Sequence, residues 1–291
     1  MNKIGITADC SSGLEYAPFK HNIKLTRTTI QFGEETLVDG IDINSEEFYK
    51  RLKNSDVIPS TSAPSPKAIL DAIEELKQQG CSEIIHFPIS FGLSDYGKNL
   101  ETSLEDFTKD IKFRVINSNT ACLMEGYLAR YAEILADKGY SIDEIIEEIP
   151  NFRDKINAFF VVNDLKYLVK NGRLSLASGM IGSLIKIKPI LNLGKSGKIE
   201  TFEKVRTKST AIKRMFELII EYGKSFDNCI YLVLHTGNVE EASQMAIDLK
   251  SCVNNAKRIE VSTITPTVGA HIGCGILGIA CLPLDGLKED I

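Results

Sequence analysis

The sequence predicts an α/β fold with two α/β domains, an N-terminal one on a doubly wound, mostly parallel sheet and a smaller C-terminal one. Short apolar runs typical of buried strands alternate along the chain with amphipathic runs at helical spacing. The length of 291 residues suits about two domains. A glutamate-rich helix ends near Phe152 and a new strand starts at Ala158, so we place the domains at residues 1–155 and 156–291.

In the N-terminal half, strands and helices alternate in the order that a parallel sheet requires. Ser45 and Ser65 are the expected N-caps of two helices, and Pro66 suits a first helical position because it has no N–H to leave unpaired. Predicted strands cover residues 3–8, 23–32, 36–38, 83–89 and 113–116. Predicted helices cover residues 45–52, 66–79, a stretch ending near residue 109, 120–137 and 141–152.

Three polar loops follow strands of this predicted sheet, at residues 9–13, 90–94 and 117–119. The carboxyl ends of parallel strands meet at one edge of a sheet, and open α/β sheets bind their ligands at that edge. We therefore expect these loops to form one side of a binding site.

The C-terminal half is predicted to form a second α/β unit with one hairpin. Its glycine-rich end, residues 267–282, is expected to pack its backbone closely within or beside a strand. Predicted strands cover residues 158–162, 185–193, 198–205, 229–234 and 258–264, the second and third forming the hairpin around residues 194–197. Predicted helices cover residues 164–169, 207–222 and 240–253.

Composition excludes several classes of protein. The net charge of −5 and the pI near 5.6 argue against a broad nucleic-acid-binding face. The seven cysteines include no Cys-x-x-Cys pair, which favours reduced thiols in the cytoplasm. The N-terminus leads directly into a strand and does not resemble a signal peptide. The apolar stretch 268–284 is too short and too rich in glycine to span a membrane, so we expect no integral membrane segment.

Residues 58–66 attract attention because they hold four hydroxyls, three prolines and no charge. Thr61 and Ser62 come just before the helix that Ser65 caps, and a helix N-terminus favours a carboxylate or phosphate. The simpler interpretation is a well-capped loop, which is commoner than an anion site.

Other chemical motifs give little support to catalysis or metal binding. Residues 273–278 match G-x-G-x-x-G, but too few residues follow for the rest of a dinucleotide-binding unit. The four histidines have no metal-ligand spacing, so we predict no metal site. Ser94 and His271 could serve as nucleophile and base of a hydrolase, although the G-x-S-x-G elbow is missing and no acid can be assigned.

Taken together, the motifs resemble the DegV family of fatty-acid-binding proteins, which includes the B subunits of bacterial fatty-acid kinase. Nine pieces match in order over nearly the whole chain, and their combination is more specific than any one of them. They are Asp9, 39–43, Thr61-Ser62-x-Pro64-Ser65, 89–94, 165–175, 187–191, 197–199, 204–206 and 268–275.

The resemblance implies a long acyl chain buried in a tunnel, with its carboxylate near the domain interface. It assigns the carboxylate to Thr61, Ser62, Ser94 and His271, and it makes Arg173 a surface residue that docks an ATP-binding kinase subunit. The chain itself would be a non-catalytic cytoplasmic monomer with a fatty acid as ligand and no cofactor. The alternatives are the serine hydrolase above, and a lipid storage or sensing protein that has no kinase partner.

Some positions depart from the family pattern around the polar end of the tunnel. Cys10 stands where the family usually has Ser, and Asn117 where it usually has Asp. Phe91, Asp95, Ile272 and Cys274 also differ from the usual residues.

Overall fold

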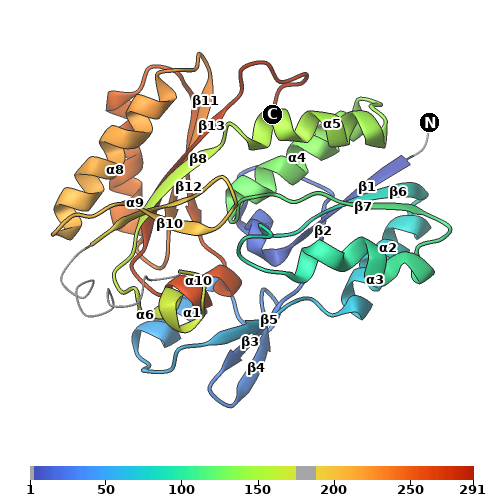
Figure 1. The fold of residues 1–291 in the computed structure, drawn as a ribbon, viewed down its shortest axis with the longest axis horizontal. Coiled ribbons are helices and arrows are strands. Elements are labelled where there is room, and N and C mark those ends of the chain that lie inside the picture. The colour runs from blue at the N-terminus through green and yellow to red at the C-terminus, as the bar shows by residue number, and fades with distance from the viewer. Residues whose placement is uncertain (1–2, 175–187) are drawn as a thin grey trace.

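The computed structural model describes residues 3–174 and 188–291, which form three sheets with surrounding helices (Figure 1). The first sheet is parallel throughout, with the order β2–β1–β6–β7, as predicted. Its strands are β1 (Lys3–Asp9), β2 (Lys24–Thr26), β6 (Cys81–Phe87) and β7 (Lys112–Val115).

Helices cover both faces of this first sheet, as expected of a doubly wound arrangement. Ile85 and Phe87 of β6 pack with α4 (Leu123–Asp137), which α5 (Ile142–Arg153) accompanies. Ile84 points to the other face and packs with α2 (Pro66–Gln78). This division follows from the strand itself, because successive side chains point to opposite faces.

The second sheet is larger and mixed, with the order β10–β9–β8–β13–β11–β12. Only β11 and β12 pair in parallel, while β9 and β10 form the predicted antiparallel hairpin. The predicted residues 185–187 of that hairpin, and Ser175 and Ile187 of the family motifs, lie outside the described residues. The strands are β8 (Asn157–Val161), β9 (Ile190–Leu193), β10 (Ile199–Glu203), β11 (Cys229–His235), β12 (Ala256–Thr263) and β13 (Leu277–Pro283).

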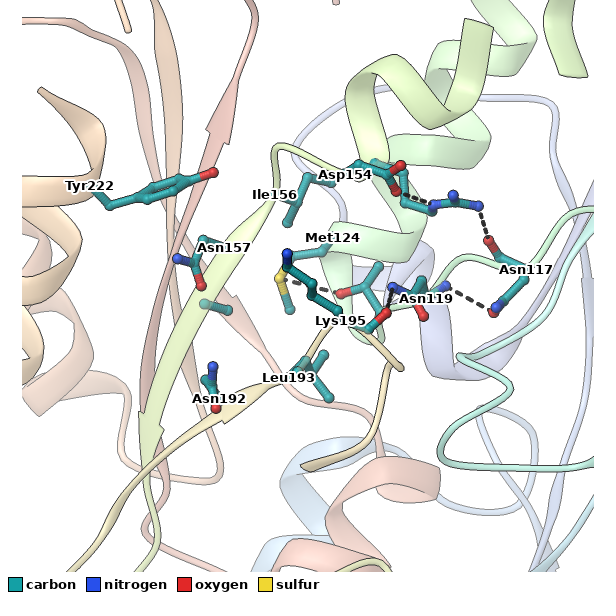
Figure 2. A pocket seen from close by; sticks show the side chains of 14 residues that line it. Asn117, Asn119, Met124, Asp154, Ile156, Asn157, Asn192, Leu193, Lys195 and Tyr222 are labelled. Atoms are coloured by element: carbon teal, nitrogen blue, oxygen red, sulfur yellow. Dashed lines mark hydrogen bonds and ion pairs between the residues drawn. The ribbon is translucent and has the colours of Figure 1, made fainter. Parts of the chain in front are cut away.

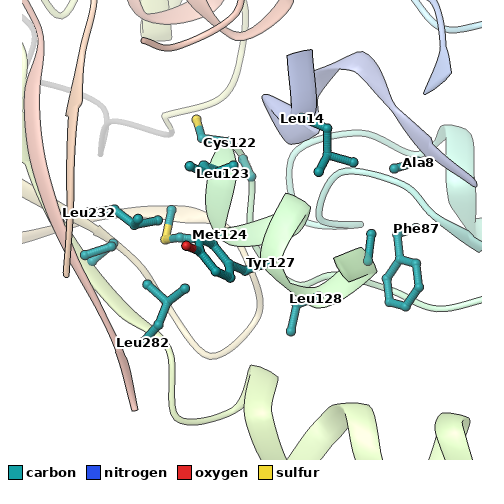
Figure 3. Close-up of a cluster of buried hydrophobic side chains, with 14 of the residues drawn as sticks. Ala8, Leu14, Phe87, Cys122, Leu123, Met124, Tyr127, Leu128, Leu232 and Leu282 are labelled. Atoms are coloured by element: carbon teal, nitrogen blue, oxygen red, sulfur yellow. The ribbon is translucent and has the colours of Figure 1, made fainter. Parts of the chain in front are cut away.

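Helix α4 belongs to the cores of both sheets. Helices α8 (Lys208–Gly223) and α9 (Val239–Cys252) cover one face of the second sheet, and its other face packs against α4. Figure 3 shows Leu232 and Leu282 of the second sheet on one side of α4, and Ala8 and Phe87 of the first sheet on the other. The two units therefore share one continuous apolar core.

A third, small antiparallel sheet was not predicted. It has the order β4–β3–β5, from β3 (Thr29–Phe32), β4 (Glu35–Val38) and β5 (Ser60–Ser62). The predicted strand 23–32 is split at Arg27 and Thr28, and its two parts join different sheets. Helices α1 (Ser45–Lys53), α6 (Lys166–Lys170) and α10 (Pro266–Ile272) contribute to the apolar cluster beside it.

Four local predictions were wrong. Residues 60–62 form a strand, not a loop, and residues 266–272 form the helix α10. The helix expected to end near residue 109 is broken into η3 (Tyr96–Asn99), α3 (Leu100–Leu104) and η4 (Glu105–Phe107), in a sequence rich in weak helix formers. Asn44, not Ser45, caps α1 through a hydrogen bond from the Glu47 N–H, whereas Ser65 caps α2 as predicted.

The three polar loops do meet at the carboxyl edge of the first sheet. Asp9 accepts a hydrogen bond from the backbone N–H of Ile89 at 2.9 Å, and Asn117 accepts one from Phe91 N–H at 3.0 Å. The first loop contains the short helices η1 (Cys10–Ser12) and η2 (Leu14–Tyr16). Among the described residues, no helix is both long and apolar enough to cross a bilayer.

Candidate functional site

A pocket of about 140 Å³ lies where the loops after β1 and β6 meet β5 and α10. It combines hydroxyl, imidazole and guanidinium groups with apolar walls. Three of the four predicted carboxylate-binding residues line it, together with Arg173. The lining residues include Asp9, Ser11, Thr61, Ser94, Tyr96, Arg173, Thr267 and His271, and the apolar side chains of Ile89, Leu93, Ile199, Val268 and Ile272.

Thr61 and His271 form the centre of the pocket, although 210 residues separate them in the chain. The Thr61 hydroxyl lies 2.8 Å from His271 Nε2. Burial, assisted by the charge of Arg173, lowers the pKa of His271 to about 4, so the imidazole is neutral near pH 7. Its Nδ1 is buried and finds no partner in the described parts of the chain. The pair therefore presents neutral hydrogen-bonding groups to a ligand.

Arg173 is not on the free surface that the resemblance implies. It is half buried, and its guanidinium donates from Nε to the Leu93 carbonyl at 3.1 Å and from Nη1 to the Asn171 carbonyl at 2.5 Å. Within residues 3–174 and 188–291 no carboxylate forms an ion pair with Arg173, although Lys98 and, after it, the charge of Arg173 lower the pKa of Asp95. Arg173 therefore brings a positive charge to the pocket. The sequence could not reveal this position, because Leu93 lies 80 residues away.

Ser94 and Ser62 have different surroundings. Ser94 lines the pocket from the loop after β6, and its hydroxyl oxygen accepts the Tyr96 N–H at 3.4 Å. Ser62 is exposed and lies outside the pocket lining, because it follows Thr61 directly on β5 and alternate side chains point to opposite faces. In the described structure no hydrogen bond joins Ser94 to His271, and no carboxylate orients the imidazole.

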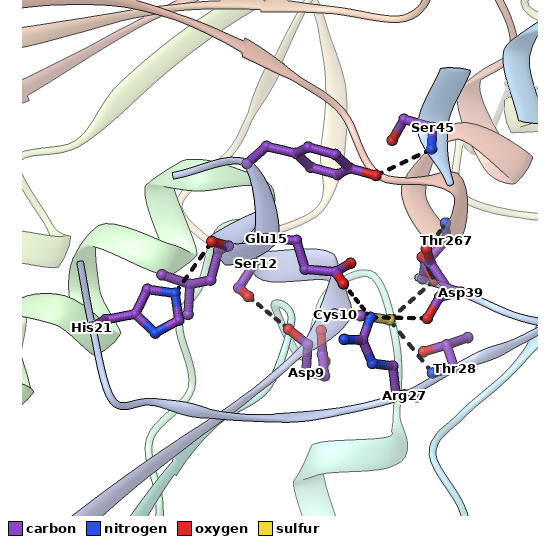
Figure 4. A network of polar contacts seen from close by, with 12 residues as sticks. Asp9, Cys10, Ser12, Glu15, His21, Arg27, Thr28, Asp39, Ser45 and Thr267 are labelled. Atoms are coloured by element: carbon purple, nitrogen blue, oxygen red, sulfur yellow. Dashed lines mark hydrogen bonds and ion pairs between the residues drawn. The ribbon is translucent and has the colours of Figure 1, made fainter. Parts of the chain in front are cut away.

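Asp39 fixes the helix that carries His271 (Figure 4). Its Oδ2 accepts hydrogen bonds from the backbone N–H of Thr267 at 2.9 Å and from the Thr267 hydroxyl at 2.5 Å. Cys10 Sγ lies 3.3 Å from the same hydroxyl. The N-terminus of α10 is thus held by the chain that leads out of the small third sheet. This role of Asp39 was missed, since its motif gives no sign of the distant partner.

A buried pair of acids lies behind the pocket. Asp9 accepts the Ser11 backbone N–H at 2.8 Å, and Glu125 accepts the Ser11 hydroxyl at 2.8 Å. Burial raises the pKa of both carboxyl groups, and the nearby Asp9 charge raises the pKa of Glu125 further. Burial and the neighbouring Asp9 charge thus both favour the neutral form of Glu125. Asp95, the acid introduced by a departure from the family pattern, lies outside the pocket and pairs with Lys98.

An apolar cavity of about 70 Å³ adjoins the polar pocket. The two cavities share the side chains of Leu93, Ile199, Val268 and Ile272. All the other residues that line it are apolar, cysteine or glycine: Ala121, Cys122, Met124, Ala158, Phe159, Phe160, Leu193, Leu234, Ile264, Ile276 and Gly278. These walls come from the start of α4 and from the second sheet. A polar pocket thus lies beside an apolar space between the two units.

The described residues contain no group of three or more His, Cys, Asp or Glu side chains placed to hold a metal ion. The neutral His271 has a threonine as its hydrogen-bond partner, and the buried Cys10 lies against hydroxyl and amide groups. The chemistry that this pocket supports is therefore the recognition of an anion by hydroxyls, an imidazole and an arginine.

Comparisons with known proteins show which family has this fold. The family model described as "Uncharacterised protein, DegV family" matches residues 3–284. A DegV domain-containing protein of Staphylococcus aureus is 30% identical over 280 residues, covering 95% of this chain and 96% of that protein. The crystal structure of a fatty acid binding DegV family protein from Streptococcus agalactiae has a TM-score of 0.88 and 27% identity, covering 98% of this chain and 100% of that chain. That of DegV, a fatty acid binding protein from Bacillus subtilis, has a TM-score of 0.86 and 29% identity, covering 97% and 100%.

Proposed function

The chain belongs to the DegV family, and we propose that it is a long-chain fatty-acid-binding protein. The observation that carries the proposal is that the polar pocket and the apolar cavity lie side by side and share four lining side chains. A carboxylate in the first would meet Thr61, Ser94 and His271, while the acyl chain would enter the second. The binding proteins from Streptococcus agalactiae and Bacillus subtilis, which share the fold over nearly the whole chain, support the same ligand class.

The polar end suits a carboxylate. Hydrogen bonds from neutral donors to an ionised acceptor are strong, and Arg173 adds a positive charge at the same place. Because the His271 imidazole is neutral, it needs no counter-ion in the ligand-free protein, and it does not repel an anion. The cost of burying the carboxylate is thus offset by several donors and by one cation.

The apolar end supplies the affinity. Each buried methylene contributes about 0.8 kcal/mol, so a long acyl chain gives ample free energy before ordering costs. The cavity of about 70 Å³ has room for only about two water molecules at liquid density. Its walls must therefore move apart when an acyl chain enters, and they can do so because they come from two different units.

A partner would carry out the chemistry. The sequence has no P-loop and no protein-kinase signature, so ATP-dependent activation of the carboxylate would need another protein. We propose that this chain is a non-catalytic monomer which presents the carboxylate to an ATP-binding kinase subunit, and that Arg173 contacts that subunit at the pocket. A storage or sensing protein without such a partner is the alternative, and the missing link between Ser94 and His271 gives the hydrolase little support.

Mass spectrometry of the purified protein tests ligand binding directly. We expect native spectra to show one long-chain fatty acid per chain, and the delipidated protein to bind added hexadecanoic acid again. The Thr61→Val variant, which keeps the shape but loses the hydroxyl, should retain less ligand. A parent protein that is free of lipid and ignores added acids would contradict the proposal. Hydrolysis of an activated acyl ester by the protein alone would favour the hydrolase.

A further inference from the structure

A third, much larger cavity lies beside the apolar one. This chamber has a volume of about 760 Å³ and opens between the end of α5, the start of β8 and the turn from β9 to β10 (Figure 2). The residues that line it are Asn117, Asn119, Thr120, Met124, Arg153, Asp154, Ile156, Asn157, Ala158, Asn192, Leu193, Gly194, Lys195 and Tyr222. None of the predicted carboxylate-binding residues is among them.

The chamber adjoins the apolar cavity. Met124, Ala158 and Leu193 line both spaces. The three cavities therefore form one series, from the polar pocket at Thr61 and His271, through the apolar space, to the chamber. Met124 stands at the second junction, and a methionine side chain adapts easily to a neighbour because it is unbranched and flexible.

Polar side chains line the chamber, whereas a site for the methyl end of an acyl chain needs only apolar ones. Four asparagine side chains, one lysine and one arginine line it. Asn192 pairs with Phe159 across β9 and β8, and Phe159 packs beneath α8, so Asn192 faces that helix. Figure 2 shows Asn119 and Lys195 with Met124 on the other side of β8.

Lys195 is the cation best placed for a ligand. Arg153 is already engaged, because it pairs with Asp154 and donates to the Asn117 carbonyl at 3.1 Å. Lys195 is exposed in the turn, and it forms no ion pair within the part of the chain that the structure describes. The turn itself is anchored, since Asn119 Nδ2 donates to the Lys195 carbonyl at 3.2 Å. The backbone of the turn that carries this lysine is thus anchored at the edge of the chamber.

We propose that the chamber receives the far end of the acyl ligand, and that the protein binds long-chain acids with a polar ω end, α,ω-dicarboxylic acids foremost. This inference rests on the proposed function, because the first carboxylate still occupies the pocket at His271. In a closed apolar tunnel a second carboxylate would be buried without partners, which is costly. Here it would reach Lys195, the side-chain amides and water.

The test is a competition assay on the delipidated protein. Hexadecanoic acid and hexadecanedioic acid each displace a bound fluorescent fatty acid, and their dissociation constants are compared. We expect the dissociation constant of the dicarboxylic acid to be within about threefold of that of hexadecanoic acid. A dead-end apolar tunnel would instead weaken the dicarboxylic acid by at least about 30-fold, the lower end of the cost of burying an unpaired polar group. 16-Hydroxyhexadecanoic acid, whose ω end is polar but uncharged, should also bind as hexadecanoic acid does.

Substitution of Lys195 tests the contact with the ω end of the ligand separately from the contacts with the carboxylate in the pocket. Lys195→Met should weaken the dicarboxylic acid by about three- to fivefold, as expected for an exposed ion pair, and leave hexadecanoic acid unchanged. Lys213→Met removes another exposed lysine, on α8, and should change neither. Strong binding of hexadecanoic acid with loss of the dicarboxylic acid would overturn the chamber proposal alone. Failure of both acids to bind the parent would overturn the proposed function itself.

Discussion

Asp39 accepts two hydrogen bonds from Thr267, a residue 228 positions further along the chain. Its Oδ1 is buried and has no partner in the described structure. This contact joins the segment after β4 to the first turn of α10, and α10 carries His271 into the pocket. The carboxylate therefore stabilises the geometry of the site at the cost of a buried charge.

The buried charge of Asp39 should make stability depend on pH. Burial raises the pKa of Asp39 from 3.8 to about 6. A raised pKa in the folded state means that the contribution to stability is complete below pH 3.8 and is lost as the pH rises through 6. Asp39→Asn cannot ionise and keeps an acceptor for Thr267. Between pH 4 and 7 the free energy of unfolding should therefore fall by about 3 kcal/mol more in the parent than in Asp39→Asn.

Urea unfolding at a series of pH values measures this difference. Other buried acids, such as Asp9 and Glu125, are the same in both proteins and cancel in the comparison. Asp106→Asn, at an exposed acid in η4, is the control and should follow the parent. Parallel curves for Asp39→Asn and the parent would show that Asp39 does not resist ionisation.

The carboxylate site should respond to the loss of each hydrogen-bonding group. Thr61→Val, Ser94→Ala and His271→Ala should each weaken fatty-acid binding by about 1–3 kcal/mol, the range for stranding a buried polar partner. Thr61→Ser keeps the hydroxyl and should retain affinity. Ser62→Ala serves as a matched control, because Ser62 is exposed and lies outside the pocket. Calorimetry that finds parental affinity in all three variants would place the carboxylate elsewhere.

His271 should report the arrival of the ligand. In the free protein its pKa is about 4, because of burial and then the charge of Arg173. A carboxylate beside the ring favours the imidazolium, so a bound fatty acid should raise the pKa of His271. Ring-nitrogen chemical shifts from ¹⁵N NMR, followed from pH 4 to 8 with and without hexadecanoic acid, measure both values. An unchanged pKa at saturating ligand would mean that the carboxylate does not contact His271.

Arg173 should affect the partner reaction more than ligand binding. The side chain is half buried, so its charge contributes little to carboxylate binding, and water can satisfy the two backbone carbonyls in its absence. Arg173→Ala should therefore lose no more than about fivefold in affinity. Arginine often dominates interfaces, and we expect acyl-phosphate formation at limiting kinase subunit to fall at least about tenfold. Arg51→Ala, at a partly exposed arginine on α1 that pairs with Glu35 and Glu47, is the control. Equal losses of binding and of acyl-phosphate formation would assign Arg173 to the ligand instead.

Gly92 should tolerate no side chain, because it lies where the loop after β6 contacts the turn from β9 to β10. A Cβ at Gly92 would lie 2.5 Å from the carbonyl carbon of Gly197, and backbone cannot easily move away. Gly92→Ala should therefore destabilise the protein by about 1–3 kcal/mol. Gly33→Ala, with open space around it, tests the cost of a positive φ alone. Urea unfolding that ranks Gly92→Ala as the milder change would show that the two segments separate in solution.

Local pattern was enough to predict most elements. The apolar runs of β1, β6 and β11 and the amphipathic helices α5, α8 and α9 were found within one or two residues of their ends. The capping of α2 by Ser65, with Pro66 following, was also correct. These features depend on interactions between residues close together in the chain, so they can be predicted from the sequence alone.

Weak local signals explain the errors. Residues 266–272 contain a glycine and β-branched residues, yet form α10 because Asp39 and the surrounding side chains hold the turn. Residues 60–62 are a strand only because β3 offers them partners. Propensity is overridden by tertiary contacts in both cases.

For the site, the sequence by itself determined which groups were available, and its motifs indicated Thr61, Ser94 and His271 together. Only the tertiary structure decided that Arg173 lines the same pocket, that Ser62 lies outside it, and that the apolar cavity adjoins a polar chamber. The reason is physical. Hydrogen-bonding capacity and side-chain volume belong to each residue, whereas contacts across 80 or 210 positions depend on how two sheets pack around α4.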